Sequence, residues 1–500
     1  FANPGTTEMP LVEALNRCSR FNRPIRSILC LHENVATGAA DGYARMVQHP
    51  SCVLLHLGVG LANGLSNLHN ARRARTPVVV LVGDLASWHA PYDPPLNTDI
   101  QELATVVSCW TRRITDPATI PRTIRSCVHA AIAEQGVATT ILCHDAVWAT
   151  DEEYSRCPHS EDDPSIDNVE NLEKLEISVD DVVQALAREN CCIFLGGDLL
   201  LQQCWGYLHA LVNGSGAILF CENGFARIDR GHGAPAVGRL PYKPSDARGA
   251  MRAFQDIVFL NTNPPKLQFG YKDDSGVLFD AEHQRLTIMP RCSATSLFTI
   301  VEKLGFTHVL DPQPQVQTAV PSDGKLNPVK LCQALAYCLP EDAVVVDESI
   351  TTGAAFWDCS KACQRFSHLT LTGGAIGIGI PLAIGAAIAC PARKVVNFQA
   401  DGSGQYSLQG LWTQARENLS ILTVICANGR YDILNMEMMM QGLLHDSPSR
   451  CLTDLGSPTI DWVSLARGYG VEAIRVSTVD GFLSAFRSWD VGPLLIEAVL

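Results

Sequence analysis

The chain has 500 residues, of which 47% are hydrophobic and 18% are charged. A single core stops growing at roughly 250–300 residues, so this length and composition predict a folded protein of about three domains rather than a disordered or coiled-coil one. The formal net charge of −14 argues against nucleic acid or an anionic membrane as partners, because both require clustered Lys and Arg. We therefore expect a soluble enzyme.

The cysteines indicate the compartment. The 19 cysteines are scattered through apolar runs, as at Cys191-Cys192 and Cys426, and form no dense framework. This distribution is typical of buried thiols in a reducing compartment, so we expect a cytoplasmic location. The longest apolar stretch, residues 373–390, is interrupted by glycines and Pro381, and no stretch reaches the roughly 18–20 residues of a membrane span.

Residues 1–150 alternate strand-like runs with helical stretches. We expect strands at 51–57 and 76–83 and helices at 34–48 and 63–74. Such alternation is typical of an α/β domain built on a parallel sheet. Residues 151–176 are acidic, contain proline and are poor in apolar residues, so they are predicted to form a linker.

Two further α/β blocks follow. The first covers residues 177–310, with strands expected at 191–195 and 256–260. A proline-rich stretch at 311–328 is the second predicted linker. Residues 329–500 form the last block, with strands expected at 343–346, 394–399 and 421–427. The expected fold is therefore α/β with three domains, each a parallel sheet flanked by helices.

Polar groups follow two strands of the last block. Asp401 ends one predicted strand, and Asn428 ends the next along the chain. A carboxylate and an amide at neighbouring strand ends can converge on Mg²⁺, which takes about six oxygens and usually only one or two side-chain ligands. Gly402 and Ser403, at a helix start, can present N–H groups to a phosphate. For an isolated Asp-Gly-Ser, a capped strand-to-helix turn is the simpler interpretation.

This segment resembles the signature of the thiamine diphosphate (ThDP) dependent enzymes, Gly-Asp-Gly followed after about 25 residues by Asn-Asn. The spacing from Asp401 to Asn428 matches the branch of benzoylformate decarboxylase and acetolactate (acetohydroxyacid) synthase. The resemblance implies that the Asp401 and Asn428 side chains and the Arg430 main-chain oxygen bind Mg²⁺, and that three residues contact the diphosphate, namely Gly402, Ser403 and Tyr431. Ala400 and Ala427 depart from the signature, but neither position is a metal ligand in the pattern.

The glycine-rich segment 373–381 resembles the family segment that holds the cofactor in its bent conformation. The resemblance implies that Ile376 lies between the two rings of ThDP and that the Gly374 carbonyl accepts from its 4′-amino group. Glycines allow the backbone to approach closely. A glycine-rich helix packing face is the alternative interpretation.

In the first block, Leu31-His32-Glu33-Asn34 precedes Ala40-Asp41-Gly42-Tyr43-Ala44. This pair of segments resembles the family's catalytic glutamate and the helix after it. A hydrogen bond from Glu33 to the pyrimidine N1′ would favour the tautomer whose 4′-nitrogen removes the thiazolium C2 proton. An apolar pocket raises the pKa of such a carboxyl toward working pH. A helix N-terminal acid is the other interpretation of Glu33.

Two residues are candidates for substrate chemistry. His56 lies 23 positions after Glu33, where sequences like benzoylformate decarboxylase carry a histidine, and it could transfer protons at the reacting carbonyl. A core histidine is the alternative. Thr6 occupies the place of a substrate-binding serine in the decarboxylases, and a simple turn is its alternative. True acetohydroxyacid synthases differ at His56 and at Gly83-Asp84.

The resemblance covers nearly the whole chain and implies a pyrimidine-binding domain (1–150), a middle domain (177–310) and a diphosphate-binding domain (329–500). It also implies a homodimer or homotetramer in which Glu33 of one chain and Asp401 of another share a site. The expected function is decarboxylation of a small 2-oxo acid, with the remaining fragment either protonated or joined to a second carbonyl, as in acetolactate synthesis. Cleavage of an acyloin or 2-hydroxyacyl thioester is a second hypothesis. A catalytically silent relative with a binding or regulatory role is a third.

Overall fold

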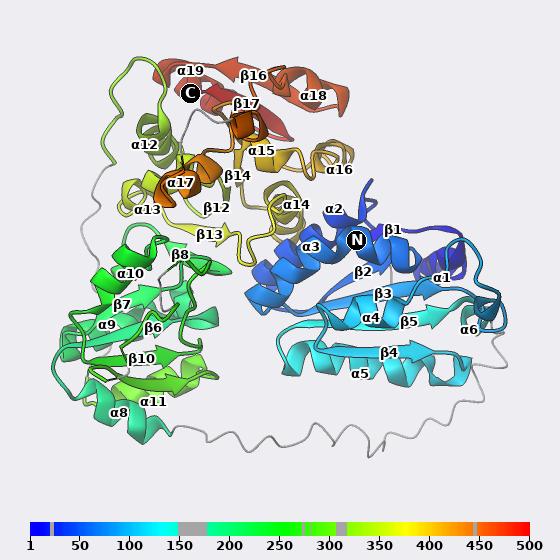
Figure 1. Ribbon diagram of the computed structural model, residues 1–500, viewed down its shortest axis with the longest axis horizontal. Coiled ribbons are helices and arrows are strands. Elements are labelled where there is room, and N and C mark those ends of the chain that lie inside the picture. Colours follow the sequence, from blue (N-terminus) through cyan, green and yellow to red (C-terminus); the bar gives the residue numbers. More distant parts are fainter. Residues whose placement is uncertain (21–24, 149–177, 273–275, 281, 307–317, 444–447) are drawn as a thin grey trace. The chain divides into compact units, whose positions relative to one another are not determined.

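The computed structural model describes the chain except for residues 21–24, 149–177, 273–275, 281, 307–317 and 444–447 (Figure 1). The described residues divide into two compact units. The first contains residues 1–167, 318–360 and 370–500, and the second contains residues 168–317 and 361–369. The predicted linker 151–176 lies outside the described residues, as does part of the linker 311–328.

The first unit begins with a parallel sheet of five strands in the order β1-β2-β3-β5-β4. Strands β3 and β5 are buried on both faces, as their apolar runs predict. The elements of this part are β1 (Ala2–Asn3), α1 (Met9–Arg20), α2 (Glu33–Val47), β2 (Ser51–Leu55), α3 (Leu57–Ala74), β3 (Val78–Asp84), α4 (Ile100–Thr105), β4 (Trp110–Ile114), α5 (Ile120–Ala133), β5 (Val137–Cys143) and α6 (His144–Val147).

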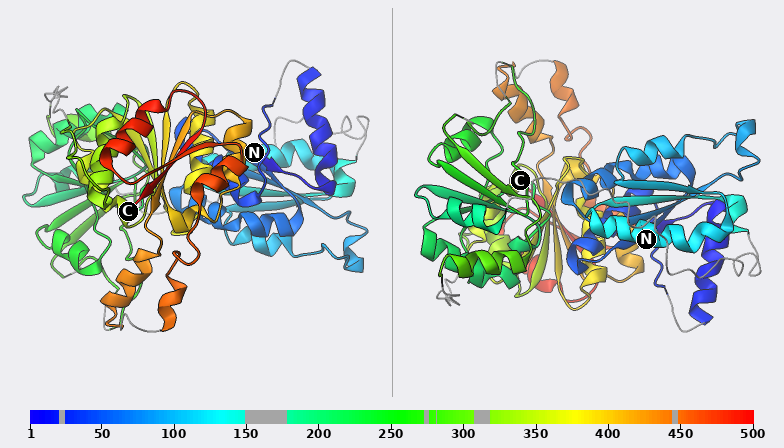
Figure 2. Two further views of the ribbon diagram at one scale, coloured as in Figure 1. Left: turned by 90° about the horizontal axis from the view of Figure 1, so that it is seen from above. Right: turned by 90° about the horizontal axis from the view of Figure 1, so that it is seen from below.

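The same unit contains a second sheet, in which strands β16-β17-β15-β14-β12 are all parallel. Its elements are α12 (Pro328–Cys338), β12 (Ala343–Glu348), α13 (Phe356–Cys359), α14 (Gly379–Ala389), β14 (Val395–Ala400), α15 (Asp401–Gly404), α16 (Gly410–Arg416), β15 (Ile421–Ala427), α17 (Asp432–Met440), α18 (Trp462–Gly468), β16 (Glu472–Val476), α19 (Val479–Ser488) and β17 (Leu494–Val499). Figure 2 shows these strands with helices around them.

The two sheets of the first unit are joined by helix packing. Helix α14 packs against α2. Glycines allow this close approach, because a Cβ added at Gly42 would lie 2.1 Å from the Leu382 carbonyl oxygen and one at Gly385 would lie 1.9 Å from the Ala39 carbonyl oxygen. The Ala-Asp-Gly-Tyr-Ala segment therefore forms a packing surface on α2.

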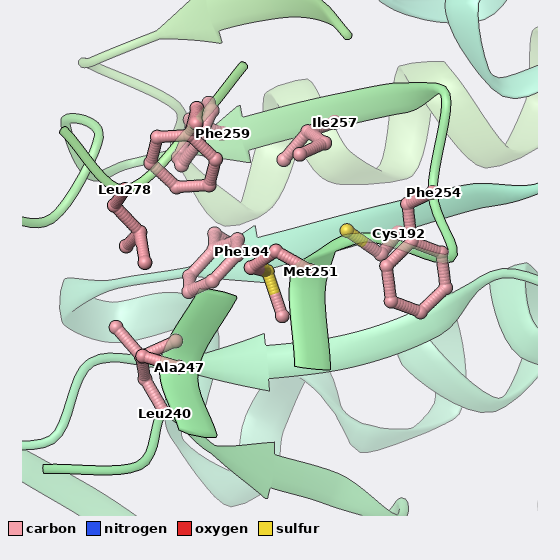
Figure 3. Packing of buried hydrophobic residues seen from close by; sticks show 10 residues of the cluster. Cys192, Phe194, Leu240, Ala247, Met251, Phe254, Ile257, Phe259 and Leu278 are labelled. Atoms are coloured by element: carbon pink, nitrogen blue, oxygen red, sulfur yellow. The ribbon is translucent and has the colours of Figure 1, made fainter. Parts of the chain in front are cut away.

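The second unit has a parallel sheet in the order β11-β10-β6-β7-β9, and an antiparallel pair formed by β8 and β13. Phenylalanines from β6 and β10 stack at its centre, where the ring centroids of Phe194 and Phe259 lie 5.2 Å apart (Figure 3). Its elements are α8 (Val179–Leu186), β6 (Cys191–Leu195), α9 (Trp205–Ser215), β7 (Ile218–Cys221), β8 (Arg227–Arg230), β9 (Val237–Arg239), α10 (Pro244–Met251), β10 (Asp256–Leu260), β11 (Arg285–Met289), α11 (Ala294–Lys303) and β13 (Phe366–Thr370).

Short 3₁₀ helices complete the described chain: η1 (Thr6–Glu8), η2 (Ala90–Tyr92), η3 (Pro117–Thr119), η5 (Gly197–Leu200), η6 (Gln202–Cys204), η7 (Thr352–Ala355) and η8 (Pro448–Leu452). The predicted α/β fold with parallel sheets and flanking helices is confirmed. Among the described residues, no helix is both long and apolar enough to cross a membrane.

Candidate active site

Glu33 is the first residue of α2, at the carboxyl edge of the first sheet. The helix starts here because the His32 side chain caps it, accepting a hydrogen bond from the Asn34 N–H at 3.1 Å. The Glu33 residue is 9% exposed, and its Oε2 accepts a hydrogen bond from Asn63 Nδ2 at 3.1 Å. No cation pairs with Glu33 among the described residues, so its carboxyl is held for hydrogen bonding rather than for an ion pair.

Gly60, in the first turn of α3, lies between Glu33 and His56. A Cβ added at Gly60 would be 3.1 Å from Glu33 Oε1 and 3.5 Å from the His56 Cβ. Glycine therefore leaves room for these two candidate catalytic residues to approach one another.

Glu8 lies beneath His56 and is fully buried. Its Oε2 is 2.9 Å from His56 Nδ1, while Thr7 Oγ1 donates to Oε1 at 2.6 Å and the Gly5 N–H donates to Oε2 at 2.8 Å. The imidazole packs over Gly5, where an added Cβ would come within 2.2 Å of the ring. A buried carboxylate on Nδ1 fixes the ring and directs Nε2 away from Glu8, as in acid–base sites that use histidine.

Thr6 precedes this group and is exposed, at the start of the short helix η1. Among the described residues, its hydroxyl makes no hydrogen bond to the Glu8 and His56 side chains, whereas the next residue, Thr7, is 8% exposed and bonds to Glu8. Thr6 therefore lies beside the candidate site with its side chain open to solvent. Its predicted contact with substrate stays a prediction.

Asp401 follows β14 directly and is the first residue of α15. The carboxylate accepts hydrogen bonds from the Gly402 N–H at 2.8 Å and from the Gly429 N–H at 2.7 Å. The second bond brings the turn after β15 to the end of β14, because Ala400 and Cys426 are register partners in the parallel sheet. Burial raises the pKa of Asp401, and the backbone hydrogen bonds oppose that rise.

The turn after β15 carries the remaining predicted ligands. Asn428 Oδ1 accepts a hydrogen bond from the Arg430 N–H at 3.2 Å, and the Arg430 guanidinium pairs with Asp432 at 2.7 Å. The Tyr431 ring lies against Gly402, where an added Cβ would be 2.3 Å from the ring. Burial raises the pKa of Tyr431. Gly402 thus leaves a narrow space beside Asp401 that any larger residue would fill.

The segment before α14 forms a loop. Gly374 has φ +77°, which favours glycine, and is exposed, while Ile376 is half-buried. Asn70 on α3 fixes the start of this loop: its Nδ2 donates to the Ala375 carbonyl at 2.7 Å, and its Oδ1 accepts from the Gly373 N–H at 3.1 Å. This arrangement contradicts the alternative of a continuous glycine-rich helix, since α14 begins only at Gly379.

The structure therefore assembles two groups within one chain. Glu33 and His56 lie together at the first sheet, and Asp401, Gly402 and Tyr431 lie together at the second. Among the described residues, no hydrogen bond or ion pair joins the two groups. The described residues also hold no cluster of three His, Cys, Asp or Glu side chains that could bind a metal, so a cation at Asp401 needs oxygens from elsewhere.

Two family models match this chain. Residues 1–104 match the model "Thiamine pyrophosphate enzyme, N-terminal TPP binding domain", and residues 351–498 match the corresponding C-terminal TPP binding domain. A Mycobacterium tuberculosis protein named "Putative acetolactate synthase large subunit IlvX" is 38% identical over 100% of this chain and 95% of its own length. The chain belongs to the thiamine pyrophosphate enzyme family. Its candidate site residues thus lie in the two parts that bind ThDP (thiamine pyrophosphate) in this family.

Two further relatives share fewer identical residues with this chain. Benzoylformate decarboxylase of Pseudomonas aeruginosa is 25% identical over 99% of this chain and 95% of that protein. Among solved structures, the ThDP-dependent 4-hydroxybenzoylformate decarboxylase of Rhodococcus jostii has a TM-score of 0.81, with 23% identity over 100% of this chain and 95% of that one. The latter shows a shared fold. The chain is therefore a ThDP-dependent enzyme related to acetolactate synthases and decarboxylases.

Sequence reasoning missed several residues of the site. Glu8, Asn63 and Asn70 each hold a predicted residue or loop in place, but none had been assigned a role. Glu8 follows Gly5 and Thr6 by only a few positions, so its closeness to the predicted substrate residue was an available signal. Nothing in the sequence near Asn70 indicated its role, because its hydrogen-bond partners are some 300 residues away along the chain.

Proposed function

We propose that this enzyme uses ThDP and Mg²⁺ to decarboxylate a small 2-oxo acid, and that the remaining fragment is either protonated or joined to a second carbonyl. The single observation that carries the proposal is the pair formed by His56 and the buried Glu8, next to Glu33 across Gly60. A positioned acid–base group beside the activating carboxylate is what a decarboxylation that ends in proton transfer requires.

The residues present fit ThDP and a divalent cation. Asp401 offers a buried carboxylate that pairs with no cation in the described part of the chain, and Asn428 offers an amide oxygen from the adjoining turn. A single carboxylate suits Mg²⁺, which commonly takes its other oxygens from phosphate, water and backbone. We assign the Arg430 carbonyl as a further ligand, and the N-terminus of α15, with Gly402 and Ser403, as the diphosphate contact together with Tyr431.

At the other end of the cofactor we assign the Gly374 carbonyl as acceptor for the 4′-amino group and Ile376 as the side chain between the rings. When bound, ThDP supplies the electron sink that stabilises negative charge as carbon dioxide leaves. Glu33 holds a proton at N1′, and its burial keeps water away from that contact. His56 presents Nε2 for proton transfer at the substrate carbonyl, with Glu8 holding the ring.

We propose further that the enzyme is a homodimer or homotetramer and that the cofactor lies between Glu33 of one subunit and Asp401 of another. The absence of any bond between these two groups within the described chain supports this arrangement. A small carbonyl compound is the proposed substrate, with Thr6 as a contact. Cleavage of an acyloin or of a 2-hydroxyacyl thioester also leaves a fragment that takes up a proton, so product analysis has to separate these reactions from decarboxylation.

Product analysis tests the proposal. The protein is reconstituted with ThDP and Mg²⁺ and incubated with a panel of aliphatic and aromatic 2-oxo acids, while carbon dioxide, aldehyde and acyloin are measured. Release of carbon dioxide together with aldehyde or acyloin is expected. Cofactor binding without carbon dioxide release from any 2-oxo acid would contradict the proposal and favour a lyase acting on acyloins, or a silent protein.

A further inference from the structure

Glu348, the last residue of β12, is a charged side chain that the proposed function does not use. It is 1% exposed. Its Oε1 accepts hydrogen bonds from the N–H groups of Gly377 at 2.7 Å and Ile378 at 3.3 Å, and its Oε2 accepts from the Gly379 N–H at 2.7 Å. One carboxylate thus binds three successive N–H groups at the point where the loop enters α14.

The loop bound by Glu348 is the loop that carries Gly374 and Ile376. Asn70 holds its beginning and Glu348 holds its end, so the loop is fixed on both sides of its exposed part. Gly377 has φ +98°, and the hydrogen bonds from the Gly377 and Ile378 N–H groups to Glu348 stabilise this conformation. An apolar residue at position 348 would leave these buried N–H groups without an acceptor, which is costly.

Glu348 is also connected to the diphosphate end of the proposed site. Gln399 Nε2 donates to Glu348 Oε2 at 2.9 Å and to Ser403 Oγ at 2.6 Å. Glu348 and Gln399 are register partners on β12 and β14, so the sheet itself places them side by side. Gly379 packs tightly against both side chains, because a Cβ added there would lie 2.1 Å from Gln399 Oε1 and 3.0 Å from Glu348 Oε2.

We propose that Glu348 is a positioning residue for the cofactor: its carboxylate sets the shape of the loop that presents Gly374 and Ile376, and Gln399 links it to Ser403. This rests on the proposed assignment of these three residues as ThDP contacts. The hydrogen-bonded chain from Ser403 to the loop makes the two ends of the cofactor site depend on one another. Burial raises the pKa of Glu348, and the Gln399 and backbone donors oppose that rise.

A purely structural role is the competing explanation, since Glu348 also lies at the N-terminus of α14, where a negative charge is stabilising. The two roles differ in what they change. A structural residue would alter the melting temperature and leave the ThDP affinity of the folded protein unchanged. A positioning residue would weaken ThDP binding and loosen the loop in protein that remains folded.

The first test is Glu348→Gln in the full chain, which keeps the shape but replaces an acceptor by an amide N–H₂ facing backbone N–H groups. Titration calorimetry with ThDP and Mg²⁺ should give a dissociation constant about tenfold to a hundredfold higher, the usual worth of hydrogen bonds to a charged group. Amide hydrogen exchange at residues 377–379 in the cofactor-free protein should become faster. Wild-type affinity and exchange in a folded variant would overturn the proposal.

Thr423→Val is the matched control. Thr423 is fully buried in β15, beside Asn397 in the sheet register, and among the described residues its hydroxyl has no hydrogen-bond partner. The substitution nearly preserves volume and removes a buried hydroxyl from the same sheet without touching the loop. ThDP affinity and exchange at residues 377–379 should match the wild-type values.

The second test needs no change at Glu348 and stays informative if Glu348→Gln fails to fold. Gln399→Met removes the link while leaving the bonds from Glu348 to the loop intact. If the link couples the two ends, the effects of Gln399→Met and Ser403→Ala on ThDP affinity are not additive, and the double variant binds about as the weaker single variant. Strict additivity would exclude the link. Both tests measure ThDP binding and not turnover. A wild-type protein that binds ThDP but turns over no 2-oxo acid would therefore contradict the proposed function and leave the role of Glu348 standing.

Discussion

His56 Nδ1 lies 2.9 Å from Oε2 of Glu8, a carboxylate that solvent does not reach. The Gly5 N–H donates to the same oxygen and the Thr7 hydroxyl donates to the other, so both oxygens of the carboxylate are held in place. A fixed carboxylate on Nδ1 sets the orientation of the ring and directs Nε2 away from Glu8. The pair is therefore built to deliver a proton from Nε2.

We expect His56→Ala to slow aldehyde release by about 10²–10⁴-fold, the usual contribution of a general acid–base group. Joining of the fragment to a second carbonyl needs no proton from His56 on the fragment itself, so the product ratio should shift toward acyloin. Chromatography of the products and a melting curve on the same sample measure both effects. The exposed His49 provides the control His49→Ala. A destabilised His56→Ala variant with an unchanged product ratio would make His56 a core residue.

Glu8→Gln should reproduce part of the His56→Ala effect with the imidazole still present. The amide keeps the shape of the side chain but removes the carboxylate that holds Nδ1, so the ring is less well oriented and kcat for aldehyde release should fall, by less than in His56→Ala. Measurement of kcat for aldehyde release, with a melting curve on the same sample, checks this. A wild-type kcat would show that Glu8 serves only the fold.

Glu33→Gln should retain the fold and bound ThDP, because the amide can still accept from Asn63 Nδ2. Exchange of the C2 proton of bound ThDP for deuterium should slow by about 10²–10⁴-fold, since the carboxyl no longer supplies a proton at N1′. Rapid quench and proton NMR report this exchange directly. Glu13→Gln, on the exposed face of the first unit, is the control. Wild-type exchange in Glu33→Gln would remove Glu33 from the catalytic residues.

ThDP binding should require a divalent cation, because a single buried carboxylate at Asp401 gives the diphosphate no attraction of its own. Calorimetry in EDTA should give little binding, and added Mg²⁺ should restore it. Asp401→Asn should weaken binding with Mg²⁺ strongly, since the variant loses the only carboxylate of the proposed metal shell. Equal affinity with and without EDTA would contradict the metal assignment.

Gly402→Ala should weaken ThDP binding, because the new methyl group would lie 2.3 Å from the Tyr431 ring and must displace it. Tyr431→Ala alone should weaken binding less, through loss of a contact only. The double variant should bind more tightly than Gly402→Ala, since the smaller residue at 431 gives the methyl group its space. If the double variant binds no better than Gly402→Ala, the methyl group is blocking the phosphate directly and the ring is not the cause.

Local sequence was sufficient for most of the elements that carry the site. The strand predicted at 421–427 is β15 with the same bounds, because a run of β-branched and apolar residues between turn residues favours a strand in any context. Helix α3 was predicted to begin at residue 63, yet it begins at Leu57. Gly58 and Gly60 have low helix propensity, and only the approach of Glu33 and His56 to Gly60 gives the reason for a glycine in that turn.

The sequence by itself determined where the reactive groups stand along the chain: Glu33 at a helix start, and Asp401 and Asn428 at the ends of strands. Only the tertiary structure decided which other residues hold them. Glu8 contacts His56, which is 48 positions away along the chain. Glu348 binds a loop about 30 positions away, and Gln399 connects Glu348 to Ser403. Spacing along the chain does not record such contacts, because strand order and register bring these residues together only when the sheets form.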